Sequence, residues 1–599
     1  MAANTNRNSI DTILTFENRN GSQWSQVLST AHVPGMDTAM GGGWSGNSAR
    51  GRRRLRVGTL ALGAFLAMHC RVTAFAITGG FFLFIMFLIM AVALLANPLR
   101  HYEIYLGQWS ISGPGRAFRI IPMFEGIGIA ICINAIVRAI TCCTIASIAA
   151  LYVLHSVADA RLPFTFCRNF DLISYQPEVT YVKSYESSRW PFHLNTMSLN
   201  GMQTTLPPVT IGFDQFRWRN RSLKTVEAVH FRPDFSFKLN IPLSVIIVIA
   251  WAIIWAVMLS EWIYNGRLVW NNMDSWFVVF PCLWTMVMIF TAFSNINSVE
   301  KIIQKAFKLN TLDTLSALAD ALQVAMYIHS ASTGTEIIHG KGLNHYVSGH
   351  IDPQLNAENV WHSGLVLVLA IFNIVNATVC ALVDLMHTVY EAHESTLWII
   401  PLYSKCASKG NYSHFLSTLI FAGLTFSYIV VAYSLLKTAL HTIFEYRVKL
   451  VFVEQIIVGL LIIFCMGLSL LFATNGGIAL LESVDALASG VAAPLLCLQE
   501  LAALLWLYRG SDFISDIHVA TEDNTCSTRI STQWQIIPFV LLLSLVLKVS
   551  VIARTELPQQ SLYAALLPLA VVIAAVPVRA ACKAYYLYRA SKLRKSTLQ

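Results

Sequence analysis

Long apolar runs recur along the whole 599-residue chain, and they restrict its fold more than any other feature of the sequence. A run of about 20 apolar residues is long enough to cross a bilayer as an α-helix. Only 13% of the residues are charged, whereas about a quarter are charged in soluble domains. We therefore predict an all-α integral membrane protein with twelve transmembrane helices. These helices are expected at about residues 57–79, 80–107, 122–155, 240–260, 274–293, 313–340, 361–387, 414–440, 449–473, 477–508, 534–553 and 561–588.

The distribution of basic residues predicts the orientation of the chain. Residues 1–56 are polar, hold seven arginines against three acids and lack the apolar core of a signal peptide. We therefore expect a disordered, cytoplasmic N-terminus. An even number of helices returns the chain to the same side, where a cytoplasmic tail follows at 590–599. The net charge of +9 then reflects topology and gives no reason to expect a nucleic-acid partner.

The long loop at 160–239 is predicted to be extracellular. Asn220 begins the glycosylation acceptor Asn-Arg-Ser in this loop, and Asn411 begins a second acceptor, Asn-Tyr-Ser, before the eighth helix. We predict that both asparagines are glycosylated. Cys167 and Cys406 also fall in loops on this side, and the sequence leaves open whether they pair.

The third predicted helix carries an arginine near its middle, in the stretch MFEGIGIAICINAIVRAITCC (123–143). Asn134, Arg138, Thr141 and Cys142 recur at a spacing that places them on one helical face. A charge inside a span costs about 2.5–3.5 kcal/mol, so such residues normally face the interior of the bundle. We expect this face to point inward.

The sixth predicted helix is interrupted by the stretch YIHSASTGTEIIHGKG (327–342), which is too polar and glycine-rich for a continuous helix facing lipid. Ser330, Ser332 and Gly334 are candidates for lining a ligand there, because a broken helix offers free backbone groups. The alternative is an ordinary kink that neighbouring helices cover. The sequence by itself supports a break in this helix only.

Motifs of enzymes are absent from the chain. It contains no His-Glu-x-x-His, no phosphate-binding Gly-Lys-Ser/Thr loop and no Gly-x-Ser-x-Gly. The four histidines between 329 and 350 do not have the spacing of metal ligands on one helix. We predict neither an enzyme nor a metal site, and no cofactor other than the ions discussed below.

Several ordered segments resemble the neurotransmitter:sodium symporter family, also called solute carrier family 6. The resemblance extends from about residue 57 to 590. The segments that carry it are PLRHYEIYLGQ (98–108), FEGIGIAICI (124–133), LPFTFC (162–167), Phe280-Pro281, NGGIALLESVD (475–485) and ELAALLWLY (500–508). YRGSDFISDI (508–517) is similar to the end of the family's tenth helix, although Asp512 stands where the family has arginine.

This resemblance implies a core of two inverted repeats of five helices. The repeats would comprise about residues 57–293 and 313–508, with the last two helices, at about 534–588, outside them. Substrate and ion sites would lie at mid-membrane, where the first and sixth helices unwind. The family further implies a multi-pass protein of the plasma membrane that moves a small organic solute, with Na+ and Cl− as coupling ions.

The departures from the family pattern concern the ion sites. The first helix, ALGAFLAMHCRVTAF (61–75), lacks the family's asparagine and its Arg-Phe-Pro. Gln323 keeps a position that the family links to chloride, but Tyr327 replaces a serine. In the eighth helix Thr425 replaces an acid, and Thr425 and Ser427 are the remaining candidate ion ligands. Sodium requires several oxygen ligands, so the departures argue against conventional coupling.

Further candidate residues follow from the resemblance. Asp485 aligns with the acid of the family's outer gate, and we predict a water-exposed pair with Arg71 or His69. Glu103 and Glu500 are predicted to serve in structural hydrogen bonding.

Two glycines and one acid complete the set of candidates. We expect Gly126 and Gly128 to allow close helix packing. Glu336 is a candidate for a proton or cation site.

Two interpretations of Arg138 stay open. Thr141 and Cys142 align with the family's pair of helix 3 tyrosines, one of which contacts substrate, so Arg138 could receive a solute carboxylate. Alternatively it is structural, and pairs with an acid such as Glu103 or Glu500 or caps the carbonyls of a broken helix.

We predict a secondary active transporter of a small organic solute that works by alternating access. The absence of an acid from the first helix favours an amino acid over a monoamine. The alternative is a non-transporting member of the fold that acts as a sensor or partner subunit, which the lost ion ligands favour. The sequence does not indicate an oligomeric state.

Overall fold

The computed structural model describes most of the apolar part of the chain. The described residues are 60–158, 195–199, 202–206, 239–265, 268, 275–294, 314–343, 355–384, 400, 403, 412–474, 477–521, 528–554 and 559–598. The predicted N-terminus at 1–56, Asn220, Asn411, Cys167 and Cys406 lie outside these residues, so the predictions for them stay predictions.

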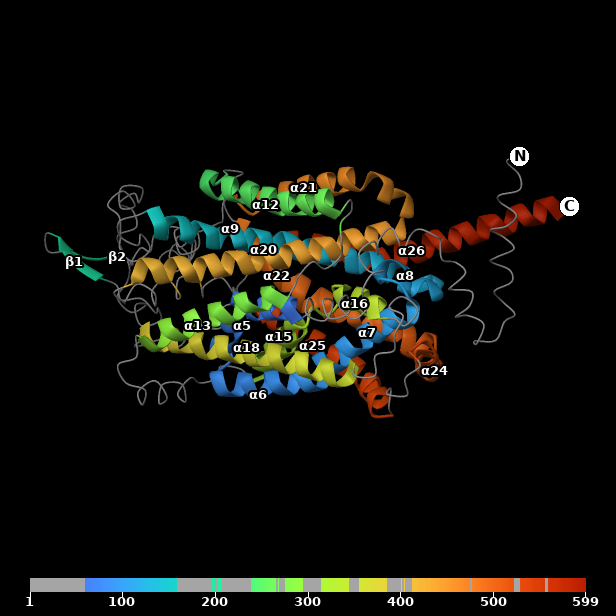
Figure 1. Cartoon of the computed structure of the whole chain (residues 1–599), viewed down its shortest axis with the longest axis horizontal. Helices are drawn as coiled ribbons and strands as arrows, with labels where there is room; N and C mark the ends of the chain where they lie inside the picture. Colours follow the sequence, from blue (N-terminus) through green and yellow to red (C-terminus); the bar gives the residue numbers. More distant parts are fainter. Residues whose placement is uncertain are drawn as a thin grey trace.

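The described chain is almost entirely helical (Figure 1). Its main helices are α5 (Cys70–Thr78), α6 (Phe81–Ala91), α7 (Asn97–Ser110), α9 (Gly126–Ala158), α12 (Ile241–Asn265), α13 (Val279–Ser294), α15 (Thr314–Ile328), α16 (Thr335–Leu343), α18 (Leu355–Asp384), α20 (Ser413–Tyr446), α21 (Glu454–Leu471), α22 (Gly477–Leu487), α23 (Ala493–Leu501), α24 (Gly510–Thr521), α25 (Thr528–Arg554) and α26 (Gln559–Leu598).

Nine helices of the described chain are long and apolar enough to cross a membrane, and a bent pair makes a tenth. Two shorter apolar helices run over Val279–Phe293 and Thr314–Ile328. These findings establish a multi-pass helical membrane protein, and the total of twelve spans remains a prediction.

The first helix is broken, which the sequence by itself did not indicate. One segment runs over Leu60–Ala67 and a second begins at Cys70, and the two are bent by 47°. The boundary with the next helix lies at Gly80, whose φ of 81° requires a glycine-like conformation.

The predicted interruption of the sixth helix is present. It divides α15 from α16 between Ile328 and Thr335. Ser330 and Ser332 have φ values of 52° and 57°, and Gly334 has 78°. Left-handed conformations end helical hydrogen bonding, so this segment cannot continue the helix.

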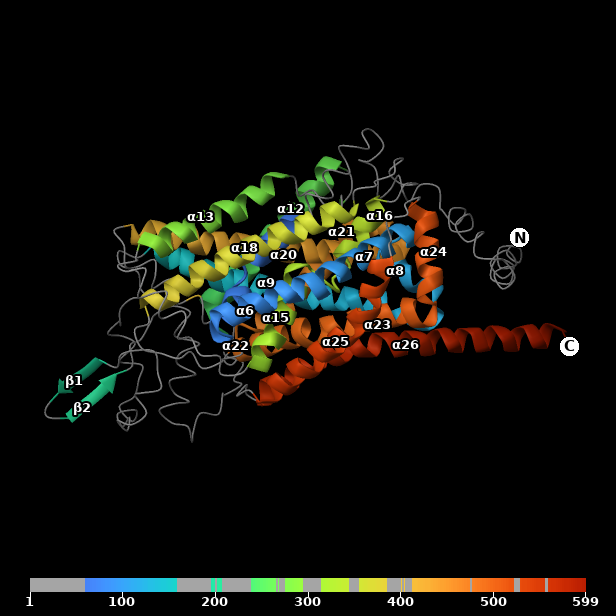
Figure 2. The same ribbon diagram turned by 90° about the horizontal axis from the view of Figure 1, so that it is seen from below.

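Two elements were missed by the sequence prediction. A small hairpin forms within the predicted 160–239 loop, where β1 (Asn195–Leu199) pairs antiparallel with β2 (Met202–Leu206). The fold is therefore nearly, but not entirely, all-α. The hairpin lies beyond one end of the bundle, and α26 projects beyond the opposite end (Figure 2). The helix α24 follows the tenth span where no element was predicted.

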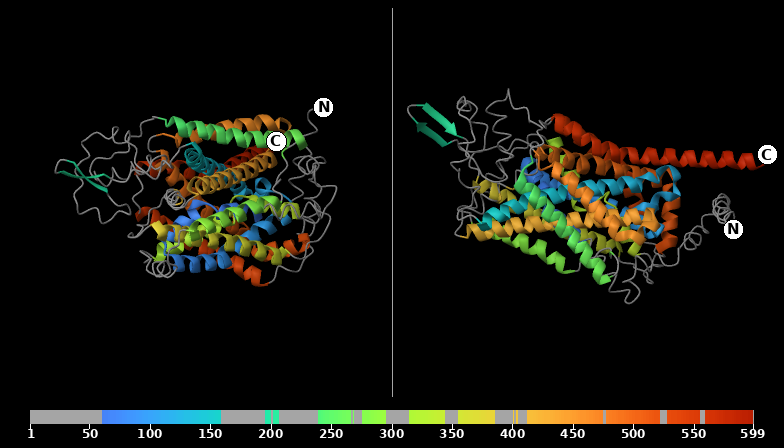
Figure 3. Two further views of the ribbon diagram at one scale, coloured as in Figure 1. Left: turned by 60° about the vertical axis from the view of Figure 1, so that its left-hand side comes forward. Right: turned by 90° about the horizontal axis from the view of Figure 1, so that it is seen from above.

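The bundle is arranged around α9 and α20, which pack extensively on each other. On the outside, α12 and α21 lie side by side (Figure 3). Apolar side chains such as Ile249 and Ile463 are exposed on these helices. Exposed apolar surface on this scale is expected of helices that contact lipid tails. The face of α9 that carries Asn134, Arg138 and Thr141 is buried, so it points into the protein as predicted.

Glycines set the closest helix contacts. A Cβ added at Gly107 on α7 would overlap the carbonyl oxygen of Ile337 on α16, and one at Gly340 would overlap that of Ile104. Gly126 and Gly128 are similarly tight, because added Cβ atoms would meet the backbone of Val576 and Pro114. Small residues allow such approaches between transmembrane helices.

We predict that Gly107→Ala lowers the thermal stability of the purified protein. The added methyl must push α7 and α16 apart, and overpacking of this kind costs about 1–3 kcal/mol. Gly459→Ala is the matched control, because nothing lies within 4 Å of its added Cβ. A thermal-unfolding comparison in detergent checks this, and equal midpoints for the two variants would refute the tight packing.

Candidate functional site

Side chains from neighbouring helices satisfy the backbone groups at the break in the first helix. The Ser427 hydroxyl donates to the carbonyl oxygen of Phe65 at 2.9 Å, and the Asn373 amide donates to that of Ala67 at 3.2 Å. The backbone N–H of Cys70 donates to the Tyr428 hydroxyl at 3.0 Å. The break is thus held by α18 and α20.

His69 is buried beside this break. Its Nδ1 lies 2.5 Å from the Tyr327 hydroxyl, and its ring stacks on Tyr428 with centroids 3.8 Å apart. The side chain faces the core between α15 and α20, so the prediction that His69 could pair with Asp485 is wrong.

Arg71 forms the predicted ion pair with Asp485. The guanidinium also donates to the Ser489 hydroxyl and, at 3.3 Å, to the Asp485 carbonyl oxygen. The prediction of a water-exposed pair is wrong, because the side chains of Arg71 and Asp485 are only 3% and 14% exposed. The pair connects α5 to α22 in an environment that strengthens its attraction.

Gln323, the predicted chloride-linked residue, lies next to this pair. Its Nε2 donates to Ser489 at 2.8 Å, while its Oε1 is buried without a hydrogen-bond partner among the described residues. On the same helix, Asp320 forms an ion pair with Lys548 of α25 at 2.8 Å.

Arg138 and Arg71 approach the same aromatic ring. The guanidinium carbon of Arg138 lies 5.0 Å from the centroid of the Tyr327 ring, and that of Arg71 lies 5.2 Å from it. Arg71 is paired, whereas no described acid lies within ion-pair distance of Arg138. The predicted pairing of Arg138 with Glu103 or Glu500 is therefore wrong.

The other polar residues on the Arg138 face differ in their hydrogen bonding. Both side-chain amide atoms of Asn134 are buried without a partner among the described residues. The Thr141 hydroxyl donates to the Arg138 carbonyl oxygen at 3.0 Å, and Cys142 is buried. Asn134 thus retains unused hydrogen-bonding capacity in the interior, one turn from Arg138.

The break in the sixth helix is held from α7. The backbone N–H of Ser332 donates to Glu103 at 2.9 Å, and Glu336 forms an ion pair with Arg100 at 3.2 Å. Glu336 is thus paired, which weakens its candidacy as a cation site. Gly334 contacts Pro114, whose ring an added Cβ would overlap.

Two predicted roles, those of Thr425 and Glu500, change with this geometry, and that of Glu103 does not. The Thr425 hydroxyl donates to the Phe421 carbonyl oxygen of its own helix, so Ser427 alone of the two candidates reaches the first helix. Glu103 accepts a structural hydrogen bond as predicted. The prediction is wrong for Glu500, whose two carboxylate oxygens are buried without a hydrogen-bond partner.

The sequence prediction missed several residues of this site. Asn373 and Tyr428 hold the first break, and Ser489 joins Gln323 to the ion pair. Asn373 was a detectable signal, because it is an amide within an otherwise apolar span. Tyr428 and Ser489 have no such signal, since their roles depend on helices distant in sequence.

The comparison with known families agrees with this architecture. The model of the sodium:neurotransmitter symporter family matches residues 72–587. The chain belongs to this family. Members of the family are sodium-coupled symporters of small solutes, use Na+ and Cl− and are not enzymes. Family membership confirms the resemblance found in the sequence.

We predict that Asp485→Asn destabilises this symporter, because it leaves Arg71 buried without a counter-charge. Breaking a buried pair in this way costs about 3–5 kcal/mol. The double variant Arg71→Met Asp485→Leu, which removes both charges, should recover most of the loss. Thermal unfolding in detergent measures the effect.

The control for this prediction is Asp512→Asn, which removes an exposed acid. It should leave the unfolding midpoint unchanged. A double variant as unstable as Asp485→Asn would contradict the ion pair as the cause.

Proposed function

We propose that this symporter carries a small solute with a carboxylate group, an amino acid in preference to a monoamine, by alternating access across the plasma membrane. One observation carries the proposal: the buried Arg138 has no acid within ion-pair distance among the described residues. An unpaired charge in the interior is unfavourable, and a solute carboxylate would neutralise it.

The surroundings of Arg138 suit such a ligand. Asn134 lies one turn before it with both amide atoms unpaired among the described residues. The centroid of the Tyr327 ring lies 5.0 Å from the guanidinium carbon of Arg138. A guanidinium binds a carboxylate through two parallel hydrogen bonds, which are stronger than bonds between neutral groups. Arg138 and Asn134, which were both predicted from the sequence as substrate-binding residues, therefore support the binding of a carboxylate.

The acids near the two breaks argue against a monoamine. Asp320 is paired with Lys548, Glu336 with Arg100 and Asp485 with Arg71. An amine would have to displace one of these buried cations to pair with any of these three acids. Arg138 has no described acid within ion-pair distance, so a solute carboxylate would not have to displace one from it.

We further propose that sodium coupling is weak and involves no more than one ion. The carbonyl oxygens of Phe65 and Ala67, which a broken helix could offer to an ion, already accept hydrogen bonds. Ser427 contributes one hydroxyl, and no carboxylate replaces the acid that the family has at Thr425. Hard cations require several oxygen ligands.

The second candidate function is that of a non-transporting sensor or partner subunit. It is favoured by the same satisfied break, because a helix interruption whose backbone groups are bonded internally does not need a ligand. Uptake of a panel of labelled amino acids and amines into vesicles separates the candidates. Absence of all uptake, with the protein present in the membrane, would favour the second.

We predict that Arg138→Gln weakens the apparent affinity for a carboxylate-bearing solute by about 10- to 150-fold. This corresponds to the loss of charged hydrogen bonds worth about 1.5–3 kcal/mol. Competition by amines should be unchanged. Concentration-dependent uptake into vesicles measures both quantities.

Arg447→Gln is the control, because Arg447 is an exposed arginine at the end of α20. It should keep the wild-type affinity. Unaltered carboxylate affinity in Arg138→Gln would exclude Arg138 as the ligand-binding group.

We predict that uptake rises hyperbolically, and not sigmoidally, as external sodium increases. Ser427→Ala should remove the sodium stimulation, because its hydroxyl is the one candidate side-chain ligand directed at the first break. Thr425→Ala should retain it, because that hydroxyl is bonded within its own helix. Sigmoidal sodium dependence in the wild type would contradict the single-ion proposal.

A further inference from the structure

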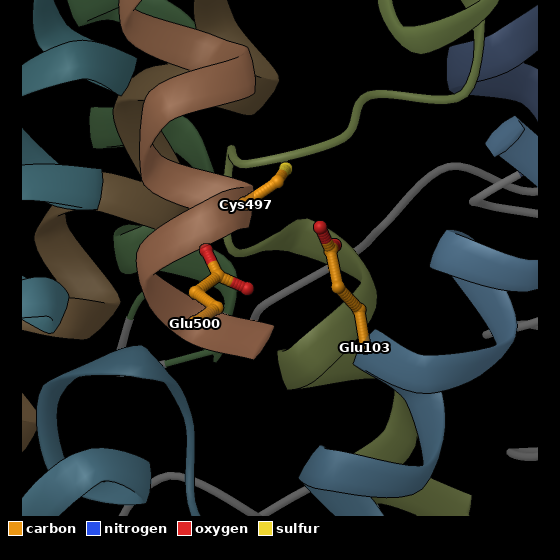
Figure 4. A group of neighbouring side chains, drawn as sticks. All are labelled: Glu103, Cys497 and Glu500. Atoms are coloured by element: carbon orange, nitrogen blue, oxygen red, sulfur yellow. The ribbon is translucent and has the colours of Figure 1, made fainter. Parts of the chain in front are cut away.

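Three potential metal ligands meet away from the Arg138 face, in the interior between α7 and α23. Glu103 extends from α7, and Cys497 and Glu500 extend from adjacent turns of α23 (Figure 4). One ligand atom of each residue lies within 4.8 Å of the others. All three residues are fully buried.

The carboxylates of this cluster are not satisfied by the described part of the chain. Both oxygens of Glu500 and the Oε2 of Glu103 are buried, and none of the described residues gives them a hydrogen-bond partner. The second oxygen of Glu103 accepts the Ser332 N–H, which fixes the side chain in place. Buried carboxylates normally find a partner, so two that converge on one point indicate a missing cation.

We propose that Glu103, Cys497 and Glu500 form a binding site for a zinc-like divalent cation. The proposal stands independently of the transported solute. Three protein donors of mixed sulfur and oxygen type suit Zn2+, which is bound by thiolate and carboxylate and tolerates four-coordination. Ca2+ and Mg2+ require more oxygen ligands than this cluster supplies.

Charge balance supports a divalent ion. Binding requires the Cys497 thiol and both carboxyl groups in their deprotonated forms, so the thiol proton and any proton held by the carboxyl groups leave to solvent. The three ligands then carry three negative charges, which Zn2+ reduces to one.

A proton shared between the two glutamates is the competing explanation. Such sharing would join the two carboxyl groups, whose oxygens lie within 4.8 Å of each other. However, it gives no role to the Cys497 thiol, which faces the same point (Figure 4). The arrangement therefore favours a metal ion over a proton.

A bound ion would connect three elements. Glu103 belongs to α7, Cys497 and Glu500 belong to α23, and Ser332 lies in the break between α15 and α16. The Ser332 side chain also lies beside the Cys497 thiol. Zinc would then hold the interrupted helix in its present position.

The test measures zinc binding to the full-length protein in lipid nanodiscs, after incubation with Zn2+ and removal of the excess. Wild type should retain one more ion per chain than Cys497→Ser or Glu500→Gln. Its affinity should exceed theirs by at least about 100-fold, since even changes beyond the ligands cost about 10- to 100-fold. Zinc should raise the unfolding midpoint of wild type and leave the midpoints of Cys497→Ser and Glu500→Gln unchanged.

Cys465→Ser is the matched control, because Cys465 is an equally buried cysteine on α21. It should behave as wild type. A second measurement uses the conservative Cys497→Ser variant, which keeps both carboxylates and covers the case in which Glu500→Gln fails to fold. Co2+ serves as a spectroscopic probe of the bond between metal and thiolate. Co2+ should give a thiolate charge-transfer band in wild type that is absent from Cys497→Ser.

Two results would overturn the proposal. One is equal zinc content and affinity in wild type and Cys497→Ser. The other is a wild type that is stabilised by acidification but not by zinc, with the acid effect lost in Glu500→Gln. That second result would assign the cluster to a shared proton.

Discussion

The structure depends on the need to satisfy backbone polar groups where two helices are interrupted inside an apolar medium. Each unsatisfied N–H or C=O costs several kcal/mol there, because no lipid atom can replace a helical partner. The first break is held by Ser427, Asn373 and Tyr428, and the second by Glu103. Glu103 on α7, Asn373 on α18, and Ser427 and Tyr428 on α20 are thereby explained as partners of the two breaks.

Most buried charged side chains are paired with an opposite charge, and there are two exceptions among the described residues. Pairs such as Arg71–Asp485 and Lys548–Asp320 join helices and leave no charge exposed to the interior. Arg138 and the Glu103–Glu500 cluster lack this compensation among the described residues. The guanidinium of Arg138 and the carboxyl groups of Glu103 and Glu500 therefore lack ion-pair partners at two separate points. We assign Arg138 to an anionic solute and the two glutamates to a cation.

Much of the fold could be predicted because the signals were local. The apolar runs predicted most helix ends to within about five residues, although α18, α20, α25 and α26 each extend six to ten residues further at one end. The polar stretch at 327–342 predicted the break in the sixth helix. The break in the first helix left no such signal, since Met68 and His69 lie in an apolar run and are held by side chains from elsewhere. The hairpin at β1 and β2 was hidden in a long loop without strong strand periodicity.

The sequence by itself determined the membrane location, the helical class and the inward direction of the Arg138 face, because these depend on composition and on spacing within one helix. It also narrowed the partner of Asp485 to two residues. Only the tertiary structure shows that Arg71 is the partner of Asp485 and that His69 contacts Tyr327 instead. It also shows that Arg138 does not pair with Glu103 or Glu500. Such choices depend on distances between helices that are remote in the chain, and those distances are set by the packing of the whole bundle.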